Sequence, residues 1–124
     1  MTTSSGMGSV TRSPLGVWRS LPETRKMAEH ALGEMMAVAK GKGAELSENA
    51  IPMVMGMFDS LPAGITTSMQ RDMMQGRPSE LDALSGAVVR FGNETDVETP
   101  LNGFMYYALL PLELRARGQL QFPD

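Results

Sequence analysis

The sequence contains no cysteine, and His30 is its only histidine. Without cysteine, the chain can form neither a disulfide bond nor a thiolate metal site. His30 follows Glu29 in a charged stretch, where we expect its side chain to be exposed to solvent. We therefore expect no histidine metal cluster, no Ser-His-Asp triad and no metal ligands of any other kind.

Long apolar runs and an excess of positive charge are also missing. No stretch approaches the ~20 apolar residues that a membrane-spanning helix needs, and no signal peptide is visible. The formal net charge is −3, whereas non-specific binding of nucleic acid requires a basic surface. We therefore expect a cytoplasmic protein that has neither a membrane nor a nucleic acid as a partner.

Strand signals are absent too, because no stretch alternates between apolar and polar residues, whereas several stretches have helical spacing. Ser20 and Glu23 form a capping-box pattern, and Thr99-Pro100 is typical of a helix start. The sequence predicts helices over about 20–40, 47–60, 66–75, 80–93 and 99–110, with Pro111 kinking or ending the last one. Residues 1–10 are rich in Ser, Thr and Gly, which predicts a frayed tail. We expect one compact all-α domain of about five or six helices.

Two apolar features stand out, namely the last predicted helix and the large number of methionines. Residues Tyr106–Leu110 are apolar nearly all round, which indicates a central, buried helix. The chain also has 12 methionines, several of which cluster at Met53, Met55, Met57, Met69, Met73 and Met74. Methionine-rich surfaces can bind varied partners, but methionine also fills cores, and we favour burial as the interpretation.

One stretch, Ser68–Gly86, holds the polar residues that look placed for chemistry. Gly76 and Pro78 break the helical pattern, and Ser79 with Asp82 resembles a capping box for the next helix. Ser68 is therefore expected on one helix and Glu80 in the first turn of the next. The intervening turn could bring both side chains toward one cleft.

Each of these two residues has a functional and a structural interpretation. Glu80 at a helix N-terminus should stay ionised and could accept hydrogen bonds from ribose hydroxyls, although its position alone favours a structural role as a charge at the helix N-terminus. Ser68 could donate to a carboxylate or a carbonyl, or could simply cap its helix. Small residues beside Glu80, namely Ala83, Gly86 and Ala87, would admit either a flat ligand or a closely packed helix.

The residues Ser68–Asp72, Gly76–Arg90 and Thr99–Asn102 resemble the C-terminal domain of ketopantoate reductase, also called 2-dehydropantoate 2-reductase. The resemblance covers nearly all of residues 1–124 and implies a fold like the C-terminal domain of 6-phosphogluconate dehydrogenase. The family is an NADPH-dependent oxidoreductase of pantothenate biosynthesis that reduces 2-dehydropantoate to pantoate. The resemblance implies that Ser68 binds the keto-acid substrate and that Glu80 contacts the nicotinamide-side ribose of NADP(H).

The chain also departs from the family pattern. The N-terminal Rossmann domain is absent from the sequence, and the family's catalytic lysine would fall upstream of Met1, so no catalytic residue is assigned. Asparagines of the same family helix have no counterpart in Thr2–Gly8, and Leu15 occupies a position that is Asn in many members.

These departures limit what we expect of the chain by itself. Hydride transfer needs a bound nicotinamide, so the chain alone should be inactive and should not bind NADP(H) tightly. We expect its partners to be the missing Rossmann domain, the keto acid in the full enzyme and a second copy in a homodimer. Met53, Met55 and Met57 are candidates for the dimer interface, because a domain cut from its partner exposes apolar surface. The alternative is a stand-alone helical interaction or oligomerisation module without catalysis.

Overall fold

The computed structural model describes all residues 1–124 and contains helices but no strands. The chain forms seven α-helices, with a short π-helical segment before the sixth. In chain order they are α1 (Thr2–Thr11), α2 (Leu15–Ser20), α3 (Pro22–Gly41), α4 (Ala50–Ser60), α5 (Ser68–Met74), η1 (Asp82–Gly86), α6 (Ala87–Thr95) and α7 (Pro100–Ala116). The predicted all-α class is confirmed, with more helices than expected.

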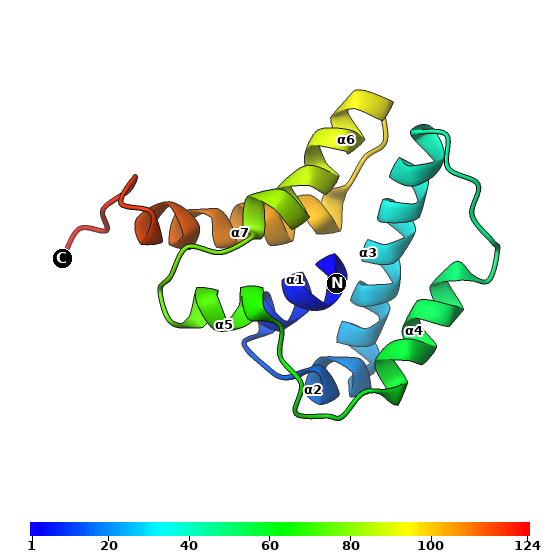
Figure 1. The fold of residues 1–124 in the computed structure, drawn as a ribbon, viewed down its shortest axis with the longest axis horizontal. Coiled ribbons are helices and arrows are strands. Elements are labelled where there is room, and N and C mark those ends of the chain that lie inside the picture. The colour runs from blue at the N-terminus through cyan, green and yellow to red at the C-terminus, as the bar shows by residue number, and fades with distance from the viewer.

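Helix α1 accounts for the main error in the prediction, because residues 1–10 do not form a frayed tail. Figure 1 shows α1 in the middle of the molecule, between α3, α5 and α7. Its small residues let neighbouring elements approach closely: a Cβ on Gly6 would lie 2.9 Å from the sulfur of Met105. The small residues that suggested a loose tail therefore allow α1 to pack closely inside the domain, and this tertiary packing stabilises the helix.

Helix α3 begins where proline suits a first turn, but the predicted capping box does not form. Pro22 is the first residue of α3, where its missing N–H costs nothing. Ser20 belongs to α2, and its hydroxyl donates to the carbonyl oxygen of Gly16 at 2.6 Å. Ala28, Ala31 and Leu32 form the buried face of α3.

Helix α7 continues through Pro111 to Ala116, so the proline does not end it. The helix is also less buried than predicted. Met105 and Leu109 lie in the core, whereas Phe104 and Tyr107 are 57% and 58% exposed. The apolar residues all around α7 therefore include a set that does not face the core of this domain.

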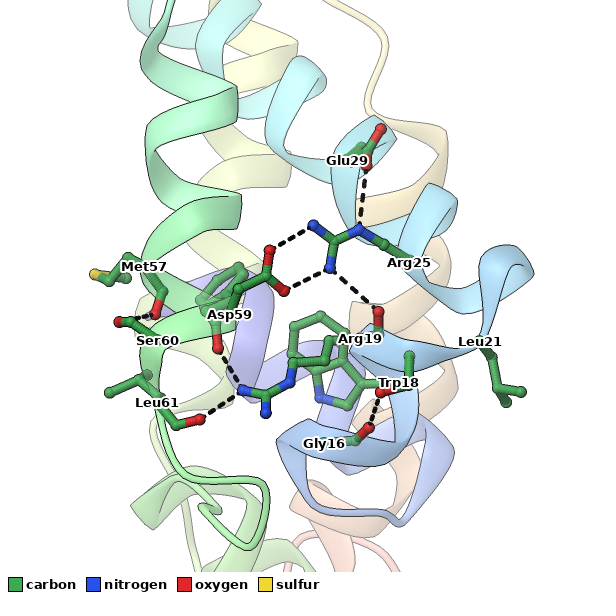
Figure 2. A network of polar contacts seen from close by, with 12 residues as sticks. Gly16, Trp18, Arg19, Leu21, Arg25, Glu29, Met57, Asp59, Ser60 and Leu61 are labelled. Carbon is green, nitrogen blue, oxygen red and sulfur yellow. Dashed lines mark hydrogen bonds and ion pairs between the residues drawn. The ribbon is translucent and has the colours of Figure 1, made fainter.

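The hydrophobic core lies between α1, α2, α3, α4 and α7. The rings of Trp18 and Phe58 meet edge to face with centroids 5.4 Å apart. Polar contacts reinforce this corner (Figure 2). The guanidinium of Arg25 donates to both carboxylate oxygens of Asp59 at 2.8 Å, and Arg19 donates to the carbonyl oxygen of Leu61 at 2.6 Å. These bonds fasten the end of α4 to α2 and α3.

The methionines divide between core and surface. Met55 and Met69 are buried, as the sequence favoured, but Met53, Met57 and Met74 are exposed. The pattern follows helix geometry, because neighbouring positions on α4 point to different sides. Burial as a general rule for these methionines is therefore wrong.

The predicted helix over 80–93 is present as η1 followed directly by α6, which continues to Thr95. Gly86, the last residue of η1, is buried, and a Cβ there would lie 3.0 Å from the ring of Tyr106. The small residues beside Glu80 therefore include one that permits close packing against α7. None of the helices combines the length and the apolar character needed to span a membrane.

Candidate functional site

Ser68 lies at the rim of a hollow bounded by α1, α2, α4 and α5. The hollow has a volume of about 320 Å³, and residues from all four helices line it, among them Ser4, Leu15, Trp18, Met57, Phe58 and Ser68. Ser68 is exposed, and it is the first residue of α5. The hollow thus combines apolar walls with hydroxyl groups at its rim, as ligand sites often do.

The structural interpretation of Ser68 as a helix cap is wrong. The hydroxyl of the preceding residue, Thr67, accepts the backbone N–H of Gln70 at 3.2 Å and caps α5. Capping therefore does not engage the Ser68 hydroxyl, which remains available to a ligand.

Arg71 adds a positive charge to the same hollow. Its guanidinium donates to the carbonyl oxygen of Thr66 at 2.8 Å and to the Thr66 hydroxyl at 3.0 Å. No carboxylate of the chain pairs with it within 4.0 Å, in contrast to Arg77, which pairs with Asp72. An anion at the rim of the hollow would therefore meet a cation and a hydroxyl.

Glu80 lies in a different hollow, next to the junction of η1 and α7. This second hollow has a volume of about 530 Å³, and its polar lining includes Asp82, Tyr106, Arg117 and Gln119. Glu80 is exposed, and its carbonyl oxygen accepts the N–H of Leu84 at 3.0 Å. Its carboxylate has no partner in the chain, so it can accept hydrogen bonds from a ligand.

The structure does not bring Ser68 and Glu80 into one cleft. Each lines its own hollow, and the segment after α5 separates them along the chain. The expected capping box of Ser79 and Asp82 does not form either. Asp82 instead contacts Tyr106 and Arg90, so its charge belongs to the second hollow.

Asp82 and Tyr106 shift each other's pKa. The Tyr106 hydroxyl donates to the Asp82 carboxylate at 2.8 Å, and this bond, helped by Arg90, holds the pKa of Asp82 below its usual 3.8. Partial burial and the neighbouring carboxylate raise the pKa of Tyr106 above 10.0. Asp82 therefore stays ionised and Tyr106 stays neutral across the physiological range.

Sequence reasoning missed two carboxylate acceptors, of which Glu113 is buried and Glu34 is partly buried. Glu113 on α7 binds the backbone and hydroxyl of Ser79, and Glu34 on α3 binds Asn102. A signal existed for Glu113, because it follows Leu109 at helical spacing on the face that α7 buries. An isolated charge on an apolar face requires a buried partner.

No three or more His, Asp and Glu side chains gather in a way that could hold a metal ion. The three lysines of α3 and its C-terminal end, Lys26, Lys40 and Lys42, line neither hollow. Lys42 pairs with Glu94 instead. The two hollows therefore offer a hydroxyl, a guanidinium and carboxylates for binding, and no lysine for proton transfer.

Comparison with known proteins gives a family. The family model described as ketopantoate reductase PanE/ApbA C terminal matches residues 2–113. A 2-dehydropantoate 2-reductase from Caulobacter vibrioides is 36% identical over 77 residues, which are 62% of this chain and 26% of that protein. One from Pyrobaculum aerophilum is 27% identical over 95 residues, covering 77% of this chain and 34% of the relative. The matches thus span about a quarter to a third of these relatives.

Solved structures share the helical fold. A dimeric ketopantoate reductase from Staphylococcus aureus superimposes with a TM-score of 0.86 at 23% identity, covering 92% of this chain and 40% of that one. A D-mandelate dehydrogenase solved with NADH and anilino(oxo)acetate gives 0.80 at 23% identity, covering 94% and 49%. At these identities the likeness concerns the fold.

Proposed function

This chain belongs to the ketopantoate reductase C-terminal domain family, and we propose that it is the substrate-binding and dimerisation domain of an NADPH-dependent reductase of 2-dehydropantoate. The observation that carries the proposal is the free hydroxyl of Ser68 at the rim of an apolar hollow, beside Arg71. The parent reaction requires a domain that binds the nucleotide in addition to this one.

The Ser68 hollow suits a small keto acid. Such a substrate has a carboxylate, a carbonyl oxygen and an apolar body, and the hollow offers a cation, a hydroxyl donor and apolar walls. Ser68 would donate to an oxygen of the substrate, and Arg71 would balance the charge of its carboxylate. Trp18 and Phe58 keep the floor of the hollow rigid through their edge-to-face contact.

Glu80 suits the sugar of the cofactor. A carboxylate without a partner accepts two hydroxyl donors, as the vicinal diol of a ribose provides. NADPH when bound would supply the hydride, and the residues of this chain would bind and orient the reactants. No phosphate-binding glycine loop follows a strand in this chain, so the phosphates would be held by a nucleotide-binding domain.

The dimer is proposed to form through α4. Met53 and Met57 point outward from this helix and are exposed, which suits an apolar interface. Met55, the third candidate from the sequence, lies in the core and is no longer a candidate. One solved relative is described as dimeric, which supports the proposal without showing its interface.

A domain-fusion experiment tests the proposed function. The chain is joined behind the nucleotide-binding domain of a family member, and the oxidation of NADPH is followed with 2-dehydropantoate. We expect no turnover from the chain alone and turnover from the fusion. Ser68→Ala should mainly raise the KM for the keto acid, and Glu80→Ala should mainly raise the KM for NADPH.

The expected sizes follow from the lost hydrogen bonds. One bond to an uncharged group contributes roughly 0.5–1.5 kcal/mol, and one to a charged group roughly 1.5–3 kcal/mol. Ser47→Ala and Glu48→Ala are matched controls, because both residues are exposed and line neither hollow. Kinetics that are unchanged in both test variants would contradict the proposed binding roles and leave a resemblance of fold only, whereas a fusion without turnover would favour an interaction module without catalysis.

A further inference from the structure

Glu113 holds the residue immediately before Glu80. This glutamate of α7 is 2% exposed, and both of its carboxylate oxygens accept the backbone N–H of Ser79, at 2.9 and 3.0 Å. The Ser79 hydroxyl donates to the same carboxylate at 2.8 Å. A buried carboxylate with this many donors is fixed in position and fixes its donors in turn.

Arg117, the residue that caps the C-terminal end of α7, completes the arrangement. Its Nε donates to Glu113 at 2.9 Å, and its Nη2 donates to the carbonyl oxygen of Ser79 at 3.0 Å. Both backbone polar groups of Ser79 are therefore held by α7. Because that carbonyl belongs to the peptide bond that joins Ser79 to Glu80, the direction in which the chain enters Glu80 is set by Arg117.

The contacts of Glu80 itself contrast with those of its neighbour. The segment is anchored on both sides, by Ser79 before Glu80 and by the bond from Leu84 to the Glu80 carbonyl oxygen after it. Only the Glu80 carboxylate remains free, and it faces the hollow that Arg117 also lines. A rigid backbone that presents one unpaired acceptor is typical of a preorganised binding site.

We propose that Glu113 and Arg117 are positioning residues that hold Glu80 for the cofactor's ribose hydroxyls. This inference rests on the proposed function, because it assumes that Glu80 binds the ribose. Its physical basis is that an acceptor already fixed in the bound geometry loses less freedom on binding. Breaking the arrangement should weaken NADPH binding even though neither residue needs to contact the nucleotide.

Stability alone does not account for these contacts. The buried Glu113 carboxylate loses its water, and pairing with the half-exposed Arg117 returns little net stability compared with apolar residues of similar size. The pair of Glu113 and Arg117 instead satisfies the N–H and the C=O of one residue, Ser79, which directly precedes the proposed ligand of the ribose. The specificity of that placement points to positioning.

The test uses the two-domain fusion and the variant Arg117→Gln. Arg117 is partly exposed, so the change should leave the fold intact, and Arg115→Gln is the matched control on the same helix turn. We expect Arg117→Gln to raise the KM for NADPH about 3- to 10-fold, and the KM for the keto acid and kcat to stay within about twofold. Arg115→Gln should change none of these values.

A double variant separates positioning from a direct contact of Arg117 with the nucleotide. If Arg117 acts through Glu80, Glu80→Ala/Arg117→Gln should be no worse than Glu80→Ala. Additive losses would overturn the positioning role. A normal KM for NADPH in Arg117→Gln, with an effect in Glu80→Ala, would overturn this inference and leave the proposed function standing. No effect in Glu80→Ala would overturn this inference together with the proposed role of Glu80, and the proposed function would then rest on the result for Ser68→Ala.

Hydrogen exchange in the chain without a cofactor gives an independent measurement. The Ser79 amide should be protected in the natural sequence and should exchange at least about tenfold faster in Glu113→Met, which keeps a side chain of similar length but removes both acceptor oxygens. The melting temperature of each variant shows whether the fold survives. Equal protection in a folded Glu113→Met would contradict the arrangement, whatever the kinetics show.

Discussion

The carboxylate of Glu34 on α3 caps the first turn of α7 through Asn102. It accepts the backbone N–H of Leu101 and of Asn102, each at 2.9 Å, and also the side-chain amide of Asn102 at 2.9 Å. The Asn102 side chain is fully buried and also donates to the carbonyl oxygen of Ala31 at 3.1 Å. Two helices far apart in sequence are thus joined at a helix N-terminus, where a negative charge is favoured.

Replacing Glu34 by alanine should destabilise the domain. The change leaves two backbone donors without their acceptor and removes one of the two acceptors of the buried Asn102 amide, which should lower the free energy of unfolding by about 2–4 kcal/mol. Urea denaturation followed by circular dichroism measures the loss. Glu98→Ala is the control, because Glu98 is exposed and lies just before α7 without binding its N–H groups. Equal stability of the two variants would contradict the capping role.

Two helical glycines should respond to alanine in opposite directions. A Cβ on Gly8 of α1 would lie 2.1 Å from Oε1 of Gln70, whose amide is held by its bond to Ser13. Gly8→Ala should therefore cost about 1–3 kcal/mol through overpacking. A Cβ on Gly56 of α4 meets no atom within 4 Å, so Gly56→Ala should stabilise by about 0.4–1 kcal/mol.

Both glycine variants can be measured in one series of urea melts at constant temperature. Because both variants replace glycine by alanine, the difference between their effects on the free energy of unfolding reports the surroundings of each glycine. A stable Gly8→Ala variant would mean that α1 does not pack against α5 as described.

Asp82 should make the domain less stable in acid. Its pKa in the folded state lies below 3.8, because Tyr106 and Arg90 favour the charged form. The stability that it contributes is therefore present above about pH 4 and is lost as the pH falls through the folded-state pKa. Since Asp82 is largely exposed, the contribution should be less than about 1 kcal/mol.

The measurement compares thermal melts of the natural sequence and Asp82→Asn from about pH 7 to pH 2.5. The natural sequence should lose its advantage over the variant below about pH 4. A difference between the two that does not depend on pH would show that the pairing of Asp82 with Tyr106 is not electrostatic.

The proposed dimer should depend on the outer face of α4. Figure 1 shows this helix at the edge of the molecule, and Met53 and Met57 are 68% and 46% exposed. Met53→Glu/Met57→Glu should shift sedimentation toward the monomer, because buried charges without partners oppose association. Met74→Glu, at another exposed methionine on α5, should leave the dimer intact. A natural sequence that stays monomeric at high concentration would overturn the proposal.

The sequence by itself determined the helical class and most helix positions, because these depend on local signals. Pro100 begins α7 as the Thr99-Pro100 pattern predicts, and α3 begins at Pro22, two residues after the predicted start. The exposure of His30 also agrees with the prediction. Each of these features is set by residues within one or two turns.

Only the tertiary structure decided the features that join distant segments. Thr2–Gly8 looked like a tail because its small residues have little helical preference, and only close neighbours show why they are small. Local helix propensity counts against a proline inside a helix, yet α7 continues past Pro111. The same holds for the site: Ser68 and Glu80 are close in sequence but line separate hollows, and the glutamate that holds the segment before Glu80 comes from α7. Such contacts depend on how whole helices pack, which no local pattern in the sequence encodes.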